Sequence, residues 1–304
     1  MREEESHYTF TVFTPTFNRG YTLPYVYRSL QAQTLRDFEW LVVDDGSTDD
    51  TSDLVSAWQT EAGFPIRYIY QENRGKHVAF NCGVREARGK LFFIIDSDDS
   101  CVPKTLERFN YHWASIPEEQ KQEYSTVTAL CMNEDGSILG KYFPADVLDI
   151  ARLDIQIKYR SLAERCGVNQ TALLRQCPFP EIEGERFISE GIVWNRLSQR
   201  YKTRFVNEML VRKKWHTDGL SASSVAIRAR NPKGARLYYA EYSSLPVPTA
   251  WKIKALINYI RFSFHAGLGG RALAAGASRT SLILMLLPLG YLAYKLDQRR
   301  LTGV

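Results

Sequence analysis

Three aspartates stand within four residues, at positions 96, 98 and 99, directly after the apolar run 91–95. Carboxylates bind hard divalent cations such as Mn²⁺ or Mg²⁺, and the oxygens of a diphosphate fill the remaining positions. A cation held in this way neutralises the charge that develops on a departing diphosphate. Asp96, Asp98 and Asp99 are therefore candidate metal ligands, and the sequence leaves open whether Asp98 or Asp99 is the main one. The alternative is that these aspartates only end a strand and begin a turn.

A second acidic pair follows another apolar run. Asp44 and Asp45 come directly after residues 38–43, and Gly46 follows them, with Thr48 or Asp49 placed to begin a helix. Paired carboxylates at a buried strand end accept hydrogen bonds from a uracil N–H group and from ribose hydroxyls. The alternative is a purely structural connection from a strand to a helix.

The elements that must position these aspartates alternate regularly. Apolar and β-branched runs predict strands, and apolar residues at helical spacing predict helices between them. The predicted strands span 8–14, 38–43, 66–70 and 90–95, with Pro15 ending the first, and the predicted helices span 23–34, 51–60 and 78–87. This alternation predicts a parallel sheet covered on both faces, which binds ligands at the carboxyl ends of its strands. Each polar cluster lies at such an end.

With these motifs in order, the sequence resembles the family 2 glycosyltransferases. The resemblance covers most of residues 8–110 and consists of residues 14–19 (TPTFNR), 44–49 (DDGSTD), 73–76 (NRGK) and 96–99 (DSDD). It implies a GT-A fold, an α/β fold with a Rossmann-like sheet that binds nucleotide sugars. It also implies Mn²⁺ or Mg²⁺ as cofactor, and donor contacts from the first loop, the first aspartates and the Asn-x-Gly segment. The residues concerned are Thr14, Thr16, Asp44, Asp45, Arg74, Lys76, Asp96 and Asp98.

Inversion at the anomeric carbon requires a general base, which takes the proton of the acceptor hydroxyl. In the family this base is an acidic residue near the start of a helix and is followed by a tryptophan. Counting back from Trp194 places Glu190 at the base position and Ser189 where a glutamate is usual. The alternatives are that Glu190 only favours a helix start, or that Glu185 or Glu183 is the base.

The second half of the predicted catalytic domain is less regular. Residues 121–140 predict strands on both sides of a turn at 134–137, as in a hairpin. Residues 213–221 lie where related enzymes have a segment that closes over the donor. His216 in this segment is a candidate contact for the metal or the diphosphate, although a single histidine is as often a surface residue. We assign residues 111–245 to the acceptor side, within a catalytic domain of residues 1–245.

Residues 246–304 form a predicted C-terminal appendage. Apolar residues between 253 and 264 share one face of an amphipathic helix. Residues 282–294 are an apolar stretch interrupted by Pro288 and Gly290, shorter than the roughly 20 residues that span a bilayer. Basic residues flank it on both sides: Arg279, Lys295, Arg299 and Arg300. This pattern favours association with one leaflet of a membrane, and the alternative is packing on the catalytic domain or a partner chain.

Composition narrows the class of protein. The chain has 304 residues, of which 44% are hydrophobic and 24% charged, so it can bury a sizeable core and is not disordered. A net charge of +5 without a basic block gives no indication of nucleic-acid binding. The five scattered cysteines fit a reducing compartment, and the acidic N-terminus does not predict a secretory signal. We therefore expect a cytoplasmic protein, peripheral on the inner face of the cell membrane.

The predicted function is metal-assisted inverting transfer of a sugar from a nucleotide sugar, with UDP as the expected nucleotide, to a glycan or lipid-linked acceptor in polysaccharide synthesis. One alternative is a sugar-phosphate nucleotidyltransferase, but residues 14–21 lack the glycine-rich, basic signature of that class. Another alternative is a noncatalytic nucleotide-sugar-binding module, which is disfavoured because the sequence has both the acidic loop and Glu190, and binding alone needs no general base. A dinucleotide-dependent oxidoreductase is disfavoured because no G-x-G-x-x-G motif follows the first predicted strand. The sequence predicts neither the particular sugar nor the oligomeric state.

Overall fold

The computed structural model describes residues 7–160, 164–214, 224–269, 273 and 280–302. The chain folds into two compact units. The first contains Met1–Pro178 and Arg196–Trp215, and the second contains Phe179–Asn195 and His216–Val304. This division does not test the functional boundary expected after residue 245, which stays a prediction.

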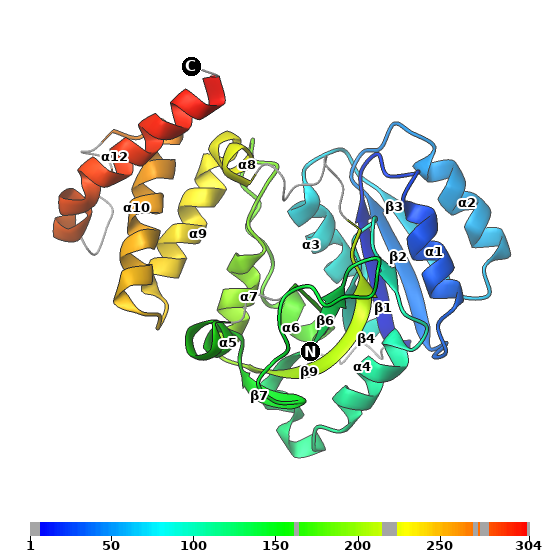
Figure 1. Cartoon of the computed structure of the whole chain (residues 1–304). Helices are drawn as coiled ribbons and strands as arrows, with labels where there is room; N and C mark the ends of the chain where they lie inside the picture. Colours follow the sequence, from blue (N-terminus) through cyan, green and yellow to red (C-terminus); the bar gives the residue numbers. More distant parts are fainter. Residues whose placement is uncertain (1–6, 161–163, 215–223, 270–272, 274–279, 303–304) are drawn as a thin grey trace. The chain divides into compact units, whose positions relative to one another are not determined.

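The first unit is built on one mixed sheet, to which the described residues contribute nine strands (Figure 1). In spatial order they are β3 (Ile66–Tyr70), β2 (Phe38–Asp44), β1 (Tyr8–Thr16), β4 (Gly89–Ile94), β8 (Arg165–Gln170), β6 (Tyr124–Met132), β9 (Lys202–Arg212) and β5 (Ser100–Cys101), with β7 (Val147–Ala151) also pairing with β9. The first four strands are parallel to one another. Because β8 is antiparallel to β4 and β6, the regular alternation stops at β4. The predicted α/β sheet is confirmed.

Helices cover both faces of the parallel part. The first unit contains α1 (Leu23–Gln31), α2 (Thr51–Glu61), α3 (Lys76–Glu86), α4 (Thr105–Ala114), the 3-10 helix η1 (Glu118–Glu123), α5 (Arg152–Tyr159) and α6 (Thr171–Arg175). On one face the ring of Tyr27 in α1 stacks on Trp58 of α2 and on Trp40 of β2. On the other face Phe13 of β1 packs against Phe80 of α3. Successive residues of a strand point to opposite faces, so these helices bury β1 on both faces from Phe10 onward.

Two local predictions are wrong. Pro15 does not end the first strand, because β1 continues to Thr16 in register with β2. The pairing of β1 with β4 ends at Phe13. Pro15 has no backbone N–H, but it lies beyond this pairing, so no hydrogen bond between β1 and β4 is lost. The predicted hairpin is reduced to a turn, closed by the Asn133 N–H bonding to the Ser137 carbonyl, and a single bridge to Ile138. Strand β6 pairs with β8 and β9 instead.

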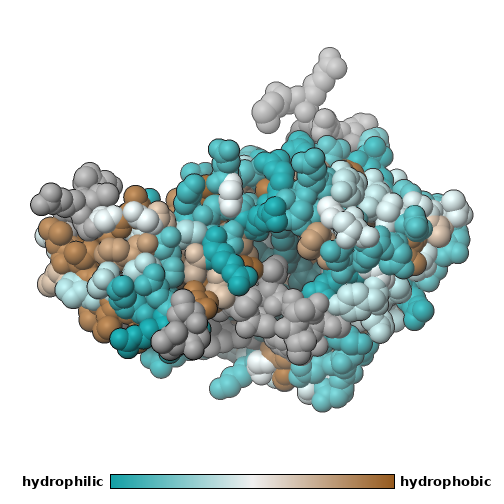
Figure 2. Space-filling model, turned by 90° about the horizontal axis from the view of Figure 1, so that it is seen from above, coloured by the Kyte–Doolittle hydropathy of each residue, from teal (hydrophilic) through white to brown (hydrophobic). Residues whose placement is uncertain are grey.

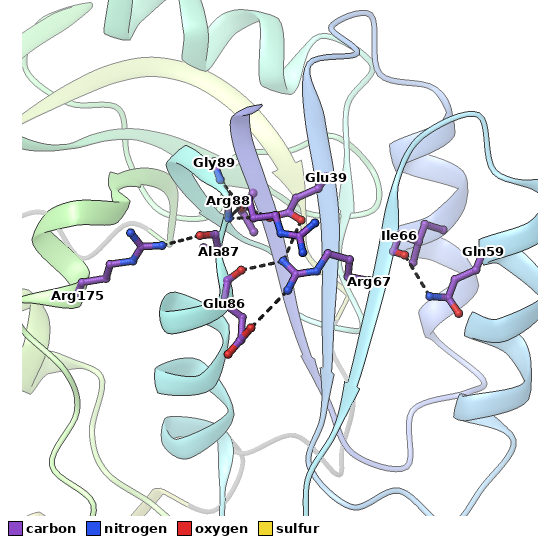
Figure 3. A network of polar contacts seen from close by, with 10 residues as sticks. Glu39, Gln59, Ile66, Arg67, Glu86, Ala87, Arg88, Gly89 and Arg175 are labelled. Atoms are coloured by element: carbon purple, nitrogen blue, oxygen red, sulfur yellow. Dashed lines mark hydrogen bonds and ion pairs between the residues drawn. The ribbon is translucent and has the colours of Figure 1, made fainter. Parts of the chain in front are cut away.

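An ion pair between Glu39 and Arg67 joins β2 and β3 near their amino ends (Figure 3). Glu39 on β2 is fully buried and accepts hydrogen bonds from Thr11 Oγ1 at 2.7 Å and the Arg88 backbone N–H at 2.8 Å. Arg67 on β3 lies 3.1 Å from the other Glu39 oxygen and also donates to the Glu86 carbonyl. Each oxygen of the buried carboxylate therefore has a partner, as a buried charge requires.

The second unit contains helices. It includes the start of α7 (Gly191–Ser198), together with α8 (Ser224–Arg230), α9 (Pro232–Ser244), α10 (Thr249–His265) and α12 (Thr280–Thr302). Leu256 and Ile260 on α10 form a core with Ile283 and Leu286 on α12, which confirms the predicted amphipathic helix. At Gly290 a Cβ atom would lie 2.3 Å from Ile260 Cγ2, so glycine allows the close approach of α10 and α12.

Helix α12 continues through Pro288, so the predicted apolar stretch belongs to a longer helix than expected. Its only acidic residue, Asp297, is 1% exposed, forms an ion pair with Arg261 of α10 and is hydrogen-bonded to His265 of α10. Elsewhere the helix exposes large apolar residues: Leu284, Met285, Leu289, Tyr291, Leu292, Leu296 and Leu301. Figure 2 shows apolar residues gathered on this helical unit. Among the described residues, no helix is both long and apolar enough to cross a membrane.

Candidate active site

Polar side chains gather at the carboxyl ends of β1, β2 and β4. Strands β1 and β2 end in register, with Thr16 opposite Asp44. Strand β4 lies on the other side of β1, and residues 96–99 follow its end. The carboxyl ends of parallel strands meet at one edge, which is where open α/β sheets bind ligands. The four motifs found in the sequence are therefore neighbours at this edge.

The two threonines of β1 differ in their surroundings. Thr14 is fully buried, and its hydroxyl accepts a hydrogen bond from the Trp40 indole at 3.0 Å. Thr16 is 3% exposed, and its hydroxyl has no hydrogen-bond partner among the described residues. A buried hydroxyl without a partner is unfavourable unless a ligand or water completes it. Both threonines are predicted to contact the nucleotide-sugar donor. Of the two, Thr16 is the one whose hydroxyl has no hydrogen-bond partner among the described residues and can therefore bind a ligand.

Asp44 and Asp45 are buried and organise the loops around them. Asp44 accepts hydrogen bonds from the Ser47 backbone N–H at 2.7 Å and the Tyr68 hydroxyl at 2.6 Å. Burial and the neighbouring Asp44 carboxylate raise the pKa of Tyr68, so the phenol stays protonated and donates. Asp45 has three donors of its own: the Gln71 amide and the backbone N–H groups of residues 74 and 75. Carboxylate oxygens have spare lone pairs, so both aspartates can still accept from a nucleoside.

The segment 73–76 connects the second motif to the acidic loop. Gly75 has a φ of 100°, a conformation that favours glycine, and α3 begins directly after it. The Arg74 side chain is exposed, while its backbone N–H bonds to Asp45 at 2.9 Å. Lys76, the first residue of α3, extends its Nζ to 2.7 Å from Asp96 Oδ1. The structure thus brings the predicted contacts Arg74, Lys76, Asp45 and Asp96 together.

Two lysines pair with two of the three loop aspartates. Lys213, directly after β9, has its Nζ 2.5 Å from Asp99 Oδ2 and 3.4 Å from Asp96 Oδ2. Burial opposes ionisation of Asp96, but the Lys76 and Lys213 ammonium groups outweigh it and hold the pKa of Asp96 below its ordinary value. Burial alone would lower the pKa of Lys213, yet Asp96 and Asp99 raise it well above the ordinary value. At neutral pH Asp96 and Lys213 are therefore charged.

Asp98 differs from its neighbours. It is half-buried and has no hydrogen bond or ion pair to any residue in the described part of the chain. Asp99, by contrast, is 3% exposed and engaged by Lys213. The sequence left open which of the two is the main metal ligand, and this geometry favours Asp98.

The predicted general base and its alternatives lie in the second unit. Glu190 is exposed and directly precedes α7, and its carbonyl accepts the Trp194 N–H. Glu185 is buried, and its two carboxylate oxygens accept the backbone N–H groups of Lys233 at 3.0 Å and Gly234 at 2.8 Å. Glu185 therefore caps the first turn of α9, where a carboxylate is favoured. Glu183 is exposed.

His216 lies outside the described residues. Sequence reasoning missed the roles of Lys213 and Tyr68. Lys213 is one of two adjacent lysines, and only the pairing of Ser100 with Arg212 places it beside the acidic loop. Tyr68 lies on β3 at a position that reads as an ordinary strand residue. No local signal identifies either residue.

The parallel part of the sheet has carboxylates, a buried hydroxyl without a partner and lysines at its carboxyl edge, an arrangement typical of an α/β domain that binds a polar ligand there. The model of glycosyl transferase family 2 matches residues 11–117. Glycosyltransferase GlyG of Streptococcus pneumoniae is 34% identical over 213 residues, which are 66% of this chain and 68% of GlyG. The chain belongs to glycosyltransferase family 2, a family of enzymes that transfer glycosyl groups.

Other relatives match shorter parts. An uncharacterized glycosyltransferase of Nostoc is 37% identical over 98 residues, 32% of this chain and only 30% of that protein. A Campylobacter jejuni protein named GalNAc(5)-diNAcBac-PP-undecaprenol beta-1,3-glucosyltransferase is 29% identical over 193 residues, 62% of this chain and 59% of that protein. The matches to these two relatives thus span less than two thirds of their length.

Solved structures share the fold. S. aureus TarS 1–349, solved with UDP-GlcNAc, matches with a TM-score of 0.63 at 18% identity, covering 97% of this chain and 92% of that one. Mannosyltransferase PcManGT of Pyrobaculum calidifontis, solved with GDP-Man and Mn²⁺, matches with a TM-score of 0.58 at 18% identity, covering 95% and 88%. At such identities the likeness establishes the GT-A fold alone.

Proposed function

We propose that this protein is an inverting glycosyltransferase that transfers a sugar from a UDP-sugar to a glycan or lipid-linked acceptor. One observation carries the proposal: four motifs far apart in sequence place a buried unpartnered hydroxyl, two buried carboxylates and a charged acidic loop at one sheet edge. A nucleoside diphosphate presents matching groups, with donors on its base and ribose and negative charge on its diphosphate. We assign catalysis to residues 1–245.

The donor contacts follow from the chemistry of each group. The Thr16 hydroxyl and the Asp44 and Asp45 carboxylates have unused acceptor capacity for the nucleoside. Lys76, at the start of α3, is placed to bind the diphosphate together with the helix N-terminus and the exposed side chain of Arg74. Thr14 supports this edge from the core, because its hydroxyl is held by Trp40. Among the solved structures with this fold, TarS binds UDP-GlcNAc and PcManGT binds GDP-Man. We propose UDP as the nucleotide, and GDP is the alternative that the nucleotide-sugar panel tests.

The acidic loop fits a hard divalent cation shared with the donor. Within the described residues, no three side chains of His, Cys, Asp or Glu form a group that holds a metal alone. Mg²⁺-type sites commonly use one or two carboxylates and complete the shell with phosphate oxygens. Asp98 would hold the cation, with Asp96 beside it, and His216 stays a further candidate. Bound there, Mn²⁺ or Mg²⁺ would offset the negative charge of the leaving diphosphate.

Glu190 is the proposed general base. Its carboxylate takes the proton from the acceptor hydroxyl, whose oxygen forms the new bond to the anomeric carbon as the bond to the diphosphate breaks. The nucleoside diphosphate leaves, and the configuration inverts because attack comes from the opposite face. Glu185 is unsuited to this role, since both of its oxygens cap α9.

A panel of nucleotide sugars with Mn²⁺ tests the proposal. We expect UDP to be released from one UDP-sugar, with release accelerated by a lipid-linked or glycan acceptor. Release of pyrophosphate from UTP and a sugar 1-phosphate would instead identify a nucleotidyltransferase. Tight binding of a nucleotide sugar without turnover on any acceptor would identify a noncatalytic binding module.

The exposed side of α12 is proposed to lie on an anionic membrane surface. This side presents apolar residues, while its charged residues, Lys295, Arg299 and Arg300, are all basic (Figure 2). The one acidic residue of the helix, Asp297, is turned inward and paired. Exposed apolar area next to basic residues matches the interface of an anionic leaflet. A lipid-linked acceptor, as in the name of the Campylobacter relative, would be presented at such a surface.

Substituting an exposed leucine of α12 tests this attachment. Leu289→Glu should weaken binding to vesicles containing anionic lipid by roughly tenfold or more, because it removes an apolar contact and adds a repelled charge. Val147→Glu is the matched control, since Val147 is 47% exposed and Leu289 is 52% exposed. Cosedimentation measures both variants. Unchanged binding by Leu289→Glu would favour packing of α12 on a partner chain.

A further inference from the structure

Lys213 is fixed beside the acidic loop by two strand partners. The register of β5 with β9 pairs Ser100 with Arg212, so the residue after Arg212 lies next to residues 96–99. The Lys213 backbone N–H also bonds to the Met132 carbonyl at the end of β6, at 2.9 Å. The position of this lysine is therefore set by the sheet.

The two lysines engage two of the three carboxylates of the loop. Lys213 contacts Asp99 and Asp96, and Lys76 contacts the other oxygen of Asp96. Asp98 has no partner among the described residues, so it is the one loop carboxylate that no ammonium group contacts. Because Asp99 is 3% exposed, solvent screens its pairing with Lys213 only weakly.

These contacts of the lysines affect how the loop can bind a divalent cation. A cation approaching the free loop meets one available carboxylate and two ammonium groups, whereas a diphosphate adds several negative oxygens. Resting on the proposed function, we propose that Lys213 is a positioning residue that withholds Asp96 and Asp99 from the cation, so that cation binding at Asp98 depends on the donor. The free protein then binds Mn²⁺ weakly, and the nucleotide diphosphate brings the cation with it.

Binding of Mn²⁺ without nucleotide tests the role of Lys213. Lys213→Met should bind Mn²⁺ about tenfold more tightly than the wild type, because it removes a positive charge within a few ångströms of the site and frees carboxylate oxygens. Electron paramagnetic resonance of free Mn²⁺ measures the dissociation constant. Merely structural damage would weaken binding, so the direction of the change separates the two roles. Lys213→Arg should keep the weak affinity.

Lys202→Met is the matched control. Lys202 begins the same strand, pairs with Glu123 at 2.7 Å, and loses the same charge on substitution. Its Mn²⁺ affinity should stay at the wild-type value. If Lys202→Met tightened Mn²⁺ binding as much as Lys213→Met, net charge alone would explain the effect and the proposal would be overturned.

A second genetic background separates the proposed role of Lys213 from an effect of misfolding. Lys213→Met leaves Asp99 buried without its partner, which destabilises a fold strongly. In an Asp99→Asn background no such carboxylate remains, and adding Lys213→Met should again tighten Mn²⁺ binding by about tenfold. Unchanged or weaker binding in this background overturns the proposal. A separate arm with UDP tests the donor site: if UDP does not raise the Mn²⁺ affinity of the wild type, the proposed function and the dependence on the donor both fail, whereas the Lys213 variants test the withholding of carboxylates without nucleotide.

Discussion

Glu190→Gln should reduce sugar transfer by roughly a hundredfold or more, the contribution typical of a general base. The amide keeps the size of the side chain but cannot accept the proton of the acceptor hydroxyl. The groups proposed to bind the nucleotide sugar, namely Thr16, Asp44, Lys76 and the acidic loop, belong to the other compact unit of the chain. UDP affinity should therefore change little, so that binding and chemistry separate. Transfer assays and calorimetry on the same preparation measure both quantities.

Two neighbouring glutamates serve as controls for this result. Glu183→Gln, at an exposed position of the same segment, should leave transfer near normal. Glu185→Gln should lower the stability of the helical unit, because it weakens the cap on α9. If Glu190→Gln retained transfer while Glu183→Gln lost it, the base would lie earlier in the segment and the count back from Trp194 would be mistaken.

Asp98→Ala should weaken binding of UDP in the presence of Mn²⁺ by roughly 10- to 100-fold, the loss that follows when a metal's surroundings are altered. The wild type should show a similar loss in EDTA, since the diphosphate then approaches the carboxylates without a bridging cation. The variant should no longer respond to EDTA. Calorimetry with and without the chelator measures all four affinities.

Asp53→Ala is the matched control for Asp98→Ala, because Asp53 is an exposed aspartate on α2. It should bind UDP with wild-type affinity and respond normally to EDTA. Equal UDP affinity in the wild type, in EDTA and in Asp98→Ala would remove the metal from the proposal and leave Lys76 and Lys213 as the cations facing the diphosphate.

The sequence predicts the parallel half of the fold well because its signals are local. Strand β3 has the predicted bounds, and β1, β2 and β4 differ from the predicted strands by one or two residues at their ends. The polar motifs stand at the ends of these strands, so their meeting at one edge follows from parallel pairing. A motif alone does not show which of its polar side chains still lacks a hydrogen-bond partner in the folded protein. Thr14 and Thr16 look alike in sequence, yet the Trp40 indole donates a hydrogen bond to the Thr14 hydroxyl, while the Thr16 hydroxyl has no partner among the described residues.

The part of the sheet beyond β4 depends on contacts between distant residues. Nothing local to β6 predicts that it pairs with β9 about 80 residues later instead of folding back after the turn at 134–137. The pairing of β9 with the distant strand β5 places Lys213 beside Asp99. Pro288 suggested an interruption, but α12 continues because its packing on α10 outweighs the loss of one backbone hydrogen bond.

The buried Glu39–Arg67 pair has a practical meaning for engineering this enzyme. It lies at the amino ends of the strands, whereas the groups proposed to bind the nucleotide sugar lie at the carboxyl ends. Replacing such a pair by well-packed apolar residues is often neutral or stabilising, provided that Thr11, whose buried hydroxyl donates to Glu39, is replaced with it, whereas removing one partner alone is costly. A thermostable variant could therefore be sought at this end of the sheet, where changes leave Thr16 and the acidic loop intact. Filling the unmet hydrogen bond of Thr16 instead would gain stability at the expense of turnover.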